Sequence, residues 1–187
     1  VNSSRSSYAG IGILKSEDKG KTWENMGLHD SHHISRILIN PSNPDEVVVG
    51  AVGHLYSKNE ERGIYKTTNG GKTWSKTLYN DDETGIIDVA VSPKNFKVQF
   101  AASWSKDRKA WDFIGSGATS GIYKSEDAGM TWKLFTNAES GFPVGEGVGR
   151  IGLAVYDDNN VYAVLDNQFK RPLQSKKSNS LPIAYSM

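Results

Sequence analysis

Three charged residues stand at one recurring position of an apolar strand pattern. Arg36 lies in ISRILINP, Asp88 in IIDVAVSP and Arg150 in VGRIGLAV. Charges in buried strands are costly unless they are paired or used, so these residues are candidates for a binding site. An arginine guanidinium can hold a carboxylate of a ligand through two parallel hydrogen bonds. The alternative is that the arginines pair with Asp88 or other acids and only line a solvated channel.

A long loop with aromatic and basic side chains, ASWSKDRKAWDFIGSGATSG, supplies the second candidate site. Aromatic rings stack on the C–H faces of sugars, while polar neighbours bind the hydroxyl groups. The alternative is that the tryptophans pack the loop onto the sheet beneath it. The candidate ligand-binding residues of this loop, and of the matching loop one repeat earlier, are Trp104, Arg108, Trp111 and His54.

Glycoside hydrolysis is the catalytic chemistry to consider here. It needs two carboxylates about 5 to 9.5 Å apart across the scissile bond. The candidates are Asp88 and Asp112, together with Glu60, Glu61 and Asp81 or Asp82. The sequence does not show which acids approach each other, so we assign no acid–base pair and leave open whether the protein is an enzyme.

A repeated turn must position these residues. The segments GIGILKSEDKGKTW, RGIYKTTNGGKTW and SGIYKSEDAGMTW share an apolar strand and then Ser/Thr-x-Asp/Asn-x-Gly-x-Thr-Trp. We expect the Asp or Asn side chain to accept bonds from backbone N–H groups of its own turn. The glycine supplies a positive φ, and the tryptophan fills space between layers. The shared residues are Ser16, Asp18, Gly20, Trp23, Thr67, Asn69, Gly71, Trp74, Ser125, Asp127, Gly129 and Trp132.

Each turn belongs to a unit of four strands. Between the turns lie two further β-rich runs, such as ISRILINP followed by EVVVGAV. Four strands per repeat predict an all-β fold made of antiparallel β-propeller blades. A single blade cannot bury both faces of its sheet, so the blades must stack on one another.

The three turns resemble the Asp-box, or BNR repeat, of sialidases, xyloglucan-cleaving glycoside hydrolases and the sortilin-type receptor propeller. SHHISRILINP followed by ERGIYKTTNGGKTW is most similar to large bacterial secreted propeller proteins described as sortilin-like or glycosyl-hydrolase-like. The resemblance covers residues 8–166 and implies a secreted or periplasmic location. It places the turns away from the usual binding face, so their residues are read as structural. Asn69 departs from the pattern, since it keeps the acceptor oxygen and loses the charge.

The amino-acid composition excludes several classes of function. Lys and Arg total 22 against 21 for Asp and Glu, a net charge of +1, which gives no support to a nucleic-acid-binding surface. The absence of cysteine excludes disulfides, zinc knuckles and thiol nucleophiles. His29, His32 and His33 lack metal-ligand spacing, so we expect no metal and no cofactor. No apolar run approaches the roughly 18 to 20 residues that span a membrane.

The blade count is low for a propeller. Known propellers need about four to eight blades, and the pattern supplies about three blade equivalents, an incomplete propeller. Either the remaining blades belong to a larger chain, or two chains complete each other as a homodimer. We expect a partial propeller over 1–168 and a basic polar tail or linker over 169–187. Within the propeller the expected parts are a half blade at 8–28, blades at 32–79 and 84–137, and a half blade at 147–166.

Two functions follow from these features. The first is a carbohydrate-recognising propeller of glycoside-hydrolase-like type, bound to a polysaccharide or glycan. The alternative is a non-catalytic sortilin-like module that binds a peptide or protein. A close carboxylate pair over an open cleft favours the enzyme, whereas a channel lined by apolar and backbone groups favours the binding module.

Overall fold

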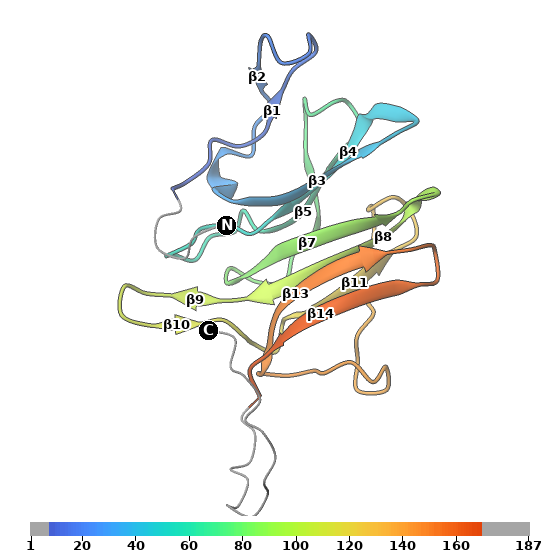
Figure 1. Ribbon diagram of the computed structural model, residues 1–187. Helices are drawn as coiled ribbons and strands as arrows, with labels where there is room; N and C mark the ends of the chain where they lie inside the picture. The colour runs from blue at the N-terminus through green and yellow to red at the C-terminus, as the bar shows by residue number, and fades with distance from the viewer. Residues whose placement is uncertain (1–7, 170–187) are drawn as a thin grey trace, which may run out of the picture.

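The computed structural model describes residues 8–169, and these residues form β-strands joined by turns and loops (Figure 1). A single short 3-10 turn, η1 (His29–Ser31), is the one helical element among them. No helix in the described part of the chain is both long and apolar enough to cross a membrane. The all-β prediction is therefore confirmed.

Two antiparallel sheets of four strands form the centre of the molecule. In both sheets the strands pair in chain order, as in a propeller blade. The first sheet contains β3 (Ile34–Asn40), β4 (Asn43–Ala51), β5 (Gly63–Thr67) and β6 (Ser75–Leu78). The second contains β7 (Thr84–Ser92), β8 (Asn95–Ser105), β11 (Gly121–Ser125) and β12 (Lys133–Leu134).

Three strand pairs complete the fold. A hairpin of β9 (Asp107–Arg108) and β10 (Phe113–Ile114) is inserted between β8 and β11. One further pair, β1 (Leu14–Lys15) with β2 (Glu24–Asn25), corresponds to the outer strands of a blade. The other, β13 (Val148–Val155) with β14 (Val161–Asn167), corresponds to the inner strands. Apart from Phe169, the expected basic tail lies outside the described residues.

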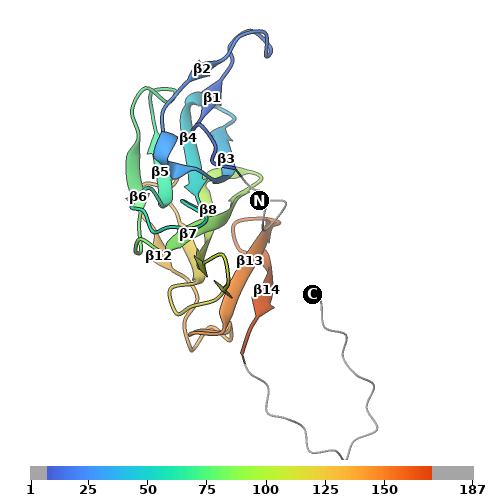
Figure 2. The same ribbon diagram turned by 90° about the vertical axis from the view of Figure 1, so that its left-hand side faces the viewer.

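The apolar core lies between successive sheets. Val48 and Ile64 of the first sheet pack against Val89 and Ala101 of the second. A second cluster joins the second sheet to β13, and a third joins the first sheet to the β1–β2 side. Figure 2 shows this succession of sheets from β1–β2 to β13–β14. Stacking therefore buries both faces of each complete sheet, as a propeller requires.

The repeated turns have the expected hydrogen bonds. Oδ1 of Asp18, Asn69 and Asp127 accepts the backbone N–H four residues later at 2.8, 3.0 and 2.9 Å. The hydroxyl groups two residues before each of these accept the N–H of a glycine whose φ lies between 83° and 94°. Asn69 thus keeps the acceptor role without a charge, and the turn prediction is confirmed.

The turn tryptophans have different surroundings. Trp74 donates its indole N–H to the Met26 carbonyl at 2.7 Å, and Trp132 donates to the Thr77 hydroxyl at 3.3 Å, so both reach the preceding sheet. Trp23 is 61% exposed, because no sheet precedes the β1–β2 pair within the described residues. The expectation that it fills space between layers is therefore wrong for Trp23.

Candidate ligand-binding pocket

Asp88 joins three neighbouring inner strands. Its Oδ1 accepts Arg36 Nε at 2.9 Å and the Val89 N–H at 3.0 Å, and its Oδ2 accepts the Leu153 N–H at 2.9 Å. Asp88 is 9% exposed. These bonds link β7 to β3 on one side and to β13 on the other. Both carboxylate oxygens are therefore engaged in a structural junction.

The three charged positions share a backbone irregularity. The regular pairing of each inner strand with its neighbour is interrupted between Ile34 and Arg36, between Ile86 and Asp88, and between Val148 and Ile151. A bulge re-aims the side chains that follow it. The repeat thus places a polar side chain at the same bulge in each inner strand.

The three charged residues at this repeat position differ in their exposure to solvent. Asp88 is buried, but the Arg36 side chain is 62% exposed and Arg150 is also exposed. Arg36 is thus paired with Asp88 and exposed, in agreement with the alternative that the arginines pair with acids and line a solvated channel. Arg150 lies instead at the edge of a cavity.

That cavity has a volume of about 250 Å³ and lies where the first sheet, the second sheet and the β13–β14 pair meet. It brings together three predicted residues, Trp104, Arg108 and Arg150, from β8, β9 and β13. The remaining lining residues are His33, Val52, Leu55, Ile87, Lys106, Phe113 and Asp166. The lining is mostly apolar. Its cationic groups come from Lys106 and Arg108 after β8 and from Arg150 of the inner strand β13.

Aromatic packing fixes one wall of the cavity. Trp104 donates its indole N–H to the Gly115 carbonyl at 2.7 Å and contacts the Phe113 ring edge-on, with 6.2 Å between centroids. The Arg108 guanidinium lies over the other ring of this pair, 4.1 Å from the Phe113 centroid. Such cation–π stacking holds the guanidinium in a defined place while its N–H donors stay available.

Lys106 also lines the cavity. It is 4% exposed, and its Nζ donates to the carbonyls of His54 and Leu55 at 2.8 and 3.1 Å. Burial, together with the nearby charges of Arg62 and Arg108, lowers the pKa of Lys106 to about 8. The side chain therefore ties the loop after β8 to the loop after β4. Nothing in its local sequence marks this role, because its partners lie in the previous repeat.

His33 also lines the cavity. Its Nδ1 lies 3.0 Å from the Gly53 carbonyl and must carry the proton of that bond, so Nε2 is an acceptor. Burial lowers the pKa of His33, and Nε2 has no partner among the described residues.

The other predicted site residues lie outside the cavity lining. The His54 ring stacks on His32, with 3.6 Å between centroids, and only its backbone carbonyl reaches Lys106. Trp111 is 84% exposed at the tip of the β9–β10 hairpin, and Asp112 there accepts the Phe113 N–H at 2.8 Å. The assignment of Asp88 and Asp112 as catalytic stays a prediction.

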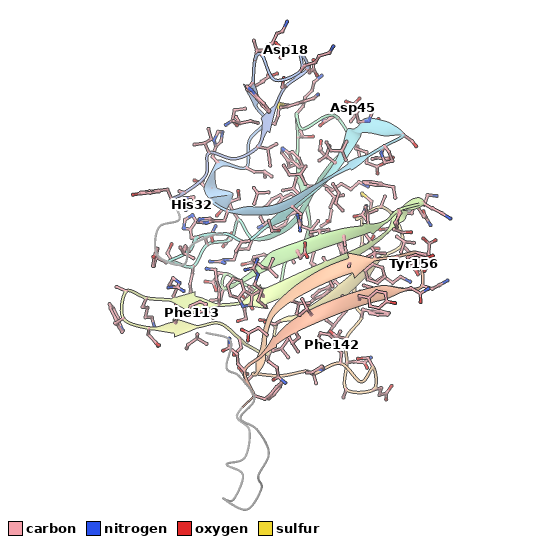
Figure 3. All side chains as sticks on the ribbon, in the orientation of Figure 1. Asp18, His32, Asp45, Phe113, Phe142 and Tyr156 are labelled. Carbon is pink, nitrogen blue, oxygen red and sulfur yellow. The ribbon has the colours of Figure 1, made fainter. Side chains whose placement is uncertain are left out.

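The cavity and the repeated turns lie at opposite ends of the sheets. The loops before β5 and β11 carry the cavity residues, and the turns follow those same strands. Figure 3 shows His32 and Phe113 at one end, and Asp45 and Tyr156 at the other. The turn residues therefore contribute to the fold, and the loop residues form the site.

The cavity has the electrostatics of a site for an anionic group. Within residues 8–169, neither Arg108 nor Arg150 has a hydrogen-bonded or ion-paired partner for its guanidinium. Asp166 is the one carboxylate of the described residues that lines the cavity. The arrangement suits an acidic group next to an apolar one, and it lacks a lining pair of carboxylates.

The fold defines a module of a β-propeller protein, with a cavity of about 250 Å³ between its sheets. The family described as "Sortilin, neurotensin receptor 3," matches residues 12–178. The chain therefore belongs to the Sortilin-Vps10 family. A search of curated proteins found no match.

Two solved structures resemble the chain in fold. The GH74 xyloglucanase from Xanthomonas campestris has a TM-score of 0.53 and 14% identity over 86% of this chain and 25% of its own. The GH74 enzyme from Niastella koreensis has a TM-score of 0.50 and 16% identity over 87% of this chain and 25% of its own. The chain thus spans about a quarter of the length of these enzymes. At such identities the likeness shows the fold alone.

Proposed function

We propose that this propeller module binds a peptide or protein segment that presents an acidic group beside an apolar side chain. The observation that carries the proposal is the pair of unpartnered guanidiniums, Arg108 and Arg150, at a cavity lined by Val52, Leu55 and Ile87. The apolar lining would bury the side chain of the ligand, and the arginines would hold its carboxylate.

Two further points favour binding over catalysis. The cavity lining contains a single carboxylate, whereas a glycosidase needs two. The matching family description names a receptor. Domains of the Sortilin-Vps10 family are typically extracytoplasmic or luminal, so we place the module on the extracytoplasmic side as part of the same proposal.

Carbohydrate recognition is the second candidate, and one observation favours it. Trp111 is 84% exposed on the β9–β10 hairpin, close to the aromatic wall of the cavity. An exposed indole is well suited to stacking on a sugar ring. Carbohydrate recognition predicts that Trp111 is essential for binding, whereas the peptide proposal predicts that Arg150 is essential for binding.

A binding screen separates the two candidates. The chain is offered to a peptide library with acidic and apolar positions and to a glycan array, and hits are titrated by calorimetry. Arg150→Gln removes a charged hydrogen bond, which is worth about 1.5 to 3 kcal/mol, and should weaken an acidic peptide roughly 10- to 100-fold. Arg36→Gln is the matched control, since it alters the same repeat position outside the cavity.

The outcomes differ clearly. Peptide binding that Arg150→Gln weakens and Arg36→Gln leaves unchanged supports the proposal. Glycan binding that Trp111→Ala abolishes and Arg150→Gln leaves intact supports the second candidate and contradicts the first. Glycan hydrolysis by the unaltered chain would contradict both binding-only proposals.

A further inference from the structure

The amine of Lys106 has no role in the proposed peptide site, although it lies at the same cavity. The side chain is 4% exposed and lines the cavity of about 250 Å³ together with Arg108 and Arg150. Lys106, Leu55 and Arg108 also line a second, smaller cavity. Because Nζ donates to the Leu55 carbonyl at 3.1 Å, the amine lies at the wall that the two cavities share.

No carboxylate within residues 8–169 forms an ion pair with Lys106, which is unusual for a buried cation. Asp107 and Glu83 line the smaller cavity beside it, but both carboxylates pair with other lysines. Asp107 accepts Lys109 Nζ at 3.0 Å, and Glu83 accepts Lys58 Nζ at 2.7 Å. The fold therefore leaves the charge of Lys106 without a paired carboxylate.

Two guanidiniums close to Lys106 favour the neutral form of its amine. Burial, which is the largest cause, and the charges of Arg62 and Arg108 lower the pKa of Lys106 to about 8, and Asp107 opposes them only in part. Since an ordinary lysine has a pKa of about 10.4, the neutral fraction of Lys106 at pH 8 is about a hundredfold larger. The neutral amine is the nucleophilic form of a lysine.

Two backbone carbonyls orient this amine. Nζ donates to the carbonyl of His54 at 2.8 Å and to that of Leu55 at 3.1 Å. A neutral amine has two N–H groups and one lone pair, so these two bonds use both N–H groups and leave the lone pair free. An apolar cavity next to further cations is also the setting in which a lysine is activated as a nucleophile.

We propose that Lys106 forms an imine with the carbonyl carbon of a small oxo acid, that is, an aldehyde or ketone that carries a carboxylate. Nζ bonds to the carbonyl carbon, and the carbonyl oxygen leaves as water with both protons of the neutral amine. The C=N bond forms without an oxidant or a reductant. Arg108 and Arg150 would hold the carboxylate. This preference for an acid rests on the proposed function, whereas the reactivity of Lys106 does not.

Reductive trapping tests the reaction. The chain is treated with glyoxylate and sodium cyanoborohydride, which reduces an imine to a stable secondary amine, and the labelled positions are mapped by mass spectrometry. Lys106 should be labelled at least about tenfold faster at pH 8 than Lys97, an exposed lysine of β8. Its labelling rate should level off above a midpoint near pH 8, whereas that of Lys97 should still increase toward pH 10.

Two arginine variants serve as a matched pair. Lys106→Arg keeps the charge and the N–H donors but has no nucleophilic amine at this pH, so the fast phase of labelling should disappear. Lys97→Arg should leave the fast phase unchanged. A far-ultraviolet circular dichroism spectrum that matches the unaltered chain shows that each variant is folded.

Acetaldehyde, which lacks a carboxylate, tests the preference for an acid. The labelling rate of Lys106 relative to Lys97 should be larger with glyoxylate than with acetaldehyde, and Arg150→Gln should remove that difference. Fast labelling of Lys106 together with this preference supports the proposal.

Labelling of Lys106 no faster than that of Lys97 overturns the proposal, and equal relative rates for the two reagents overturn the assignment to oxo acids. The peptide screen needs no covalent step, so a failure of peptide binding is distinguishable from a failure of this reaction.

Discussion

Replacing Asp88 with alanine should destabilise the fold and leave the cavity residues in place. The substitution removes the acceptor of the Leu153 N–H and of the Arg36 guanidinium, and the link between β3, β7 and β13 is lost. Sequence alone left Asp88 as a candidate for catalysis. Its position in the structural junction instead predicts that the substitution lowers the free energy of unfolding and does not directly alter ligand binding.

The size of the effect follows from the partners. A hydrogen bond to a charged group contributes about 1.5 to 3 kcal/mol, and the Leu153 N–H would lose this partner in a partly buried place. The Arg36 contact counts for less than about 1 kcal/mol, because that side chain is 62% exposed and its charge is screened by water. We therefore expect Asp88→Ala to lower the free energy of unfolding by about 2 to 4 kcal/mol.

Urea unfolding followed by tryptophan fluorescence measures this loss. With a slope of about 2 kcal/mol per molar urea, the midpoint should fall by about 1 to 2 M. Asp88→Asn is the matched control: its one amide oxygen can still accept the Leu153 N–H, while its NH2 group replaces the acceptor of the Val89 N–H and of Arg36, so the Leu153 bond is tested at nearly constant side-chain size. An unchanged midpoint for Asp88→Ala, or loss of ligand binding at unchanged stability, would refute the structural role.

Two further predictions concern the repeated turns. Although burial would raise the pKa of Asp127, hydrogen bonds from Thr131, Ser125 and Met130 lower it to about 2. Its contribution to stability is therefore complete above the unfolded pKa of about 3.9 and is lost as the pH falls toward 2. Asp127→Asn, which creates the residue found naturally at position 69, should flatten the pH dependence of the urea midpoint in that acidic range, and an unaltered slope would contradict this. Trp132→Ala should lower the free energy of unfolding by about 3 kcal/mol, because Trp132 packs against the core between the two complete sheets. Trp23→Ala should lower it by less than about 1 kcal/mol, because Trp23 is 61% exposed. Equal losses for the two variants in thermal unfolding would contradict this difference.

The fold was predictable because its main signals are local. The turn needs an acceptor, a glycine and a following N–H within a few residues, and all three can be read from SEDKGKT or TTNGGKT. The strands around it show β-branched runs of ordinary length. Trp23 shows the limit of such reasoning. Its sequence context matches that of Trp74 and Trp132, and only the absence of a preceding sheet among the described residues leaves it exposed.

The candidate site was predictable only in part, because it is assembled from different repeats. Trp104, Arg108 and Arg150 were candidates and line one cavity. Lys106 escaped notice, since its partners are backbone carbonyls in another loop, and His33 was considered only as a metal ligand, since its bond to the Gly53 carbonyl has no signal in the sequence. Backbone carbonyls carry no sequence signal, so contacts of this kind cannot be read from residue types.

The repeat position occupied by Arg36, Asp88 and Arg150 has a different environment in each of the three repeats. Arg36 and Asp88 satisfy each other across neighbouring inner strands, and the second oxygen of Asp88 binds the backbone of β13 at Leu153. The guanidinium of Arg150 has no ion-pair partner in the described residues, and Arg150 lines the cavity instead. The same repeat position therefore serves the junction of the inner strands in two repeats and lines the cavity in the third, so the type of residue at this position does not by itself predict its role.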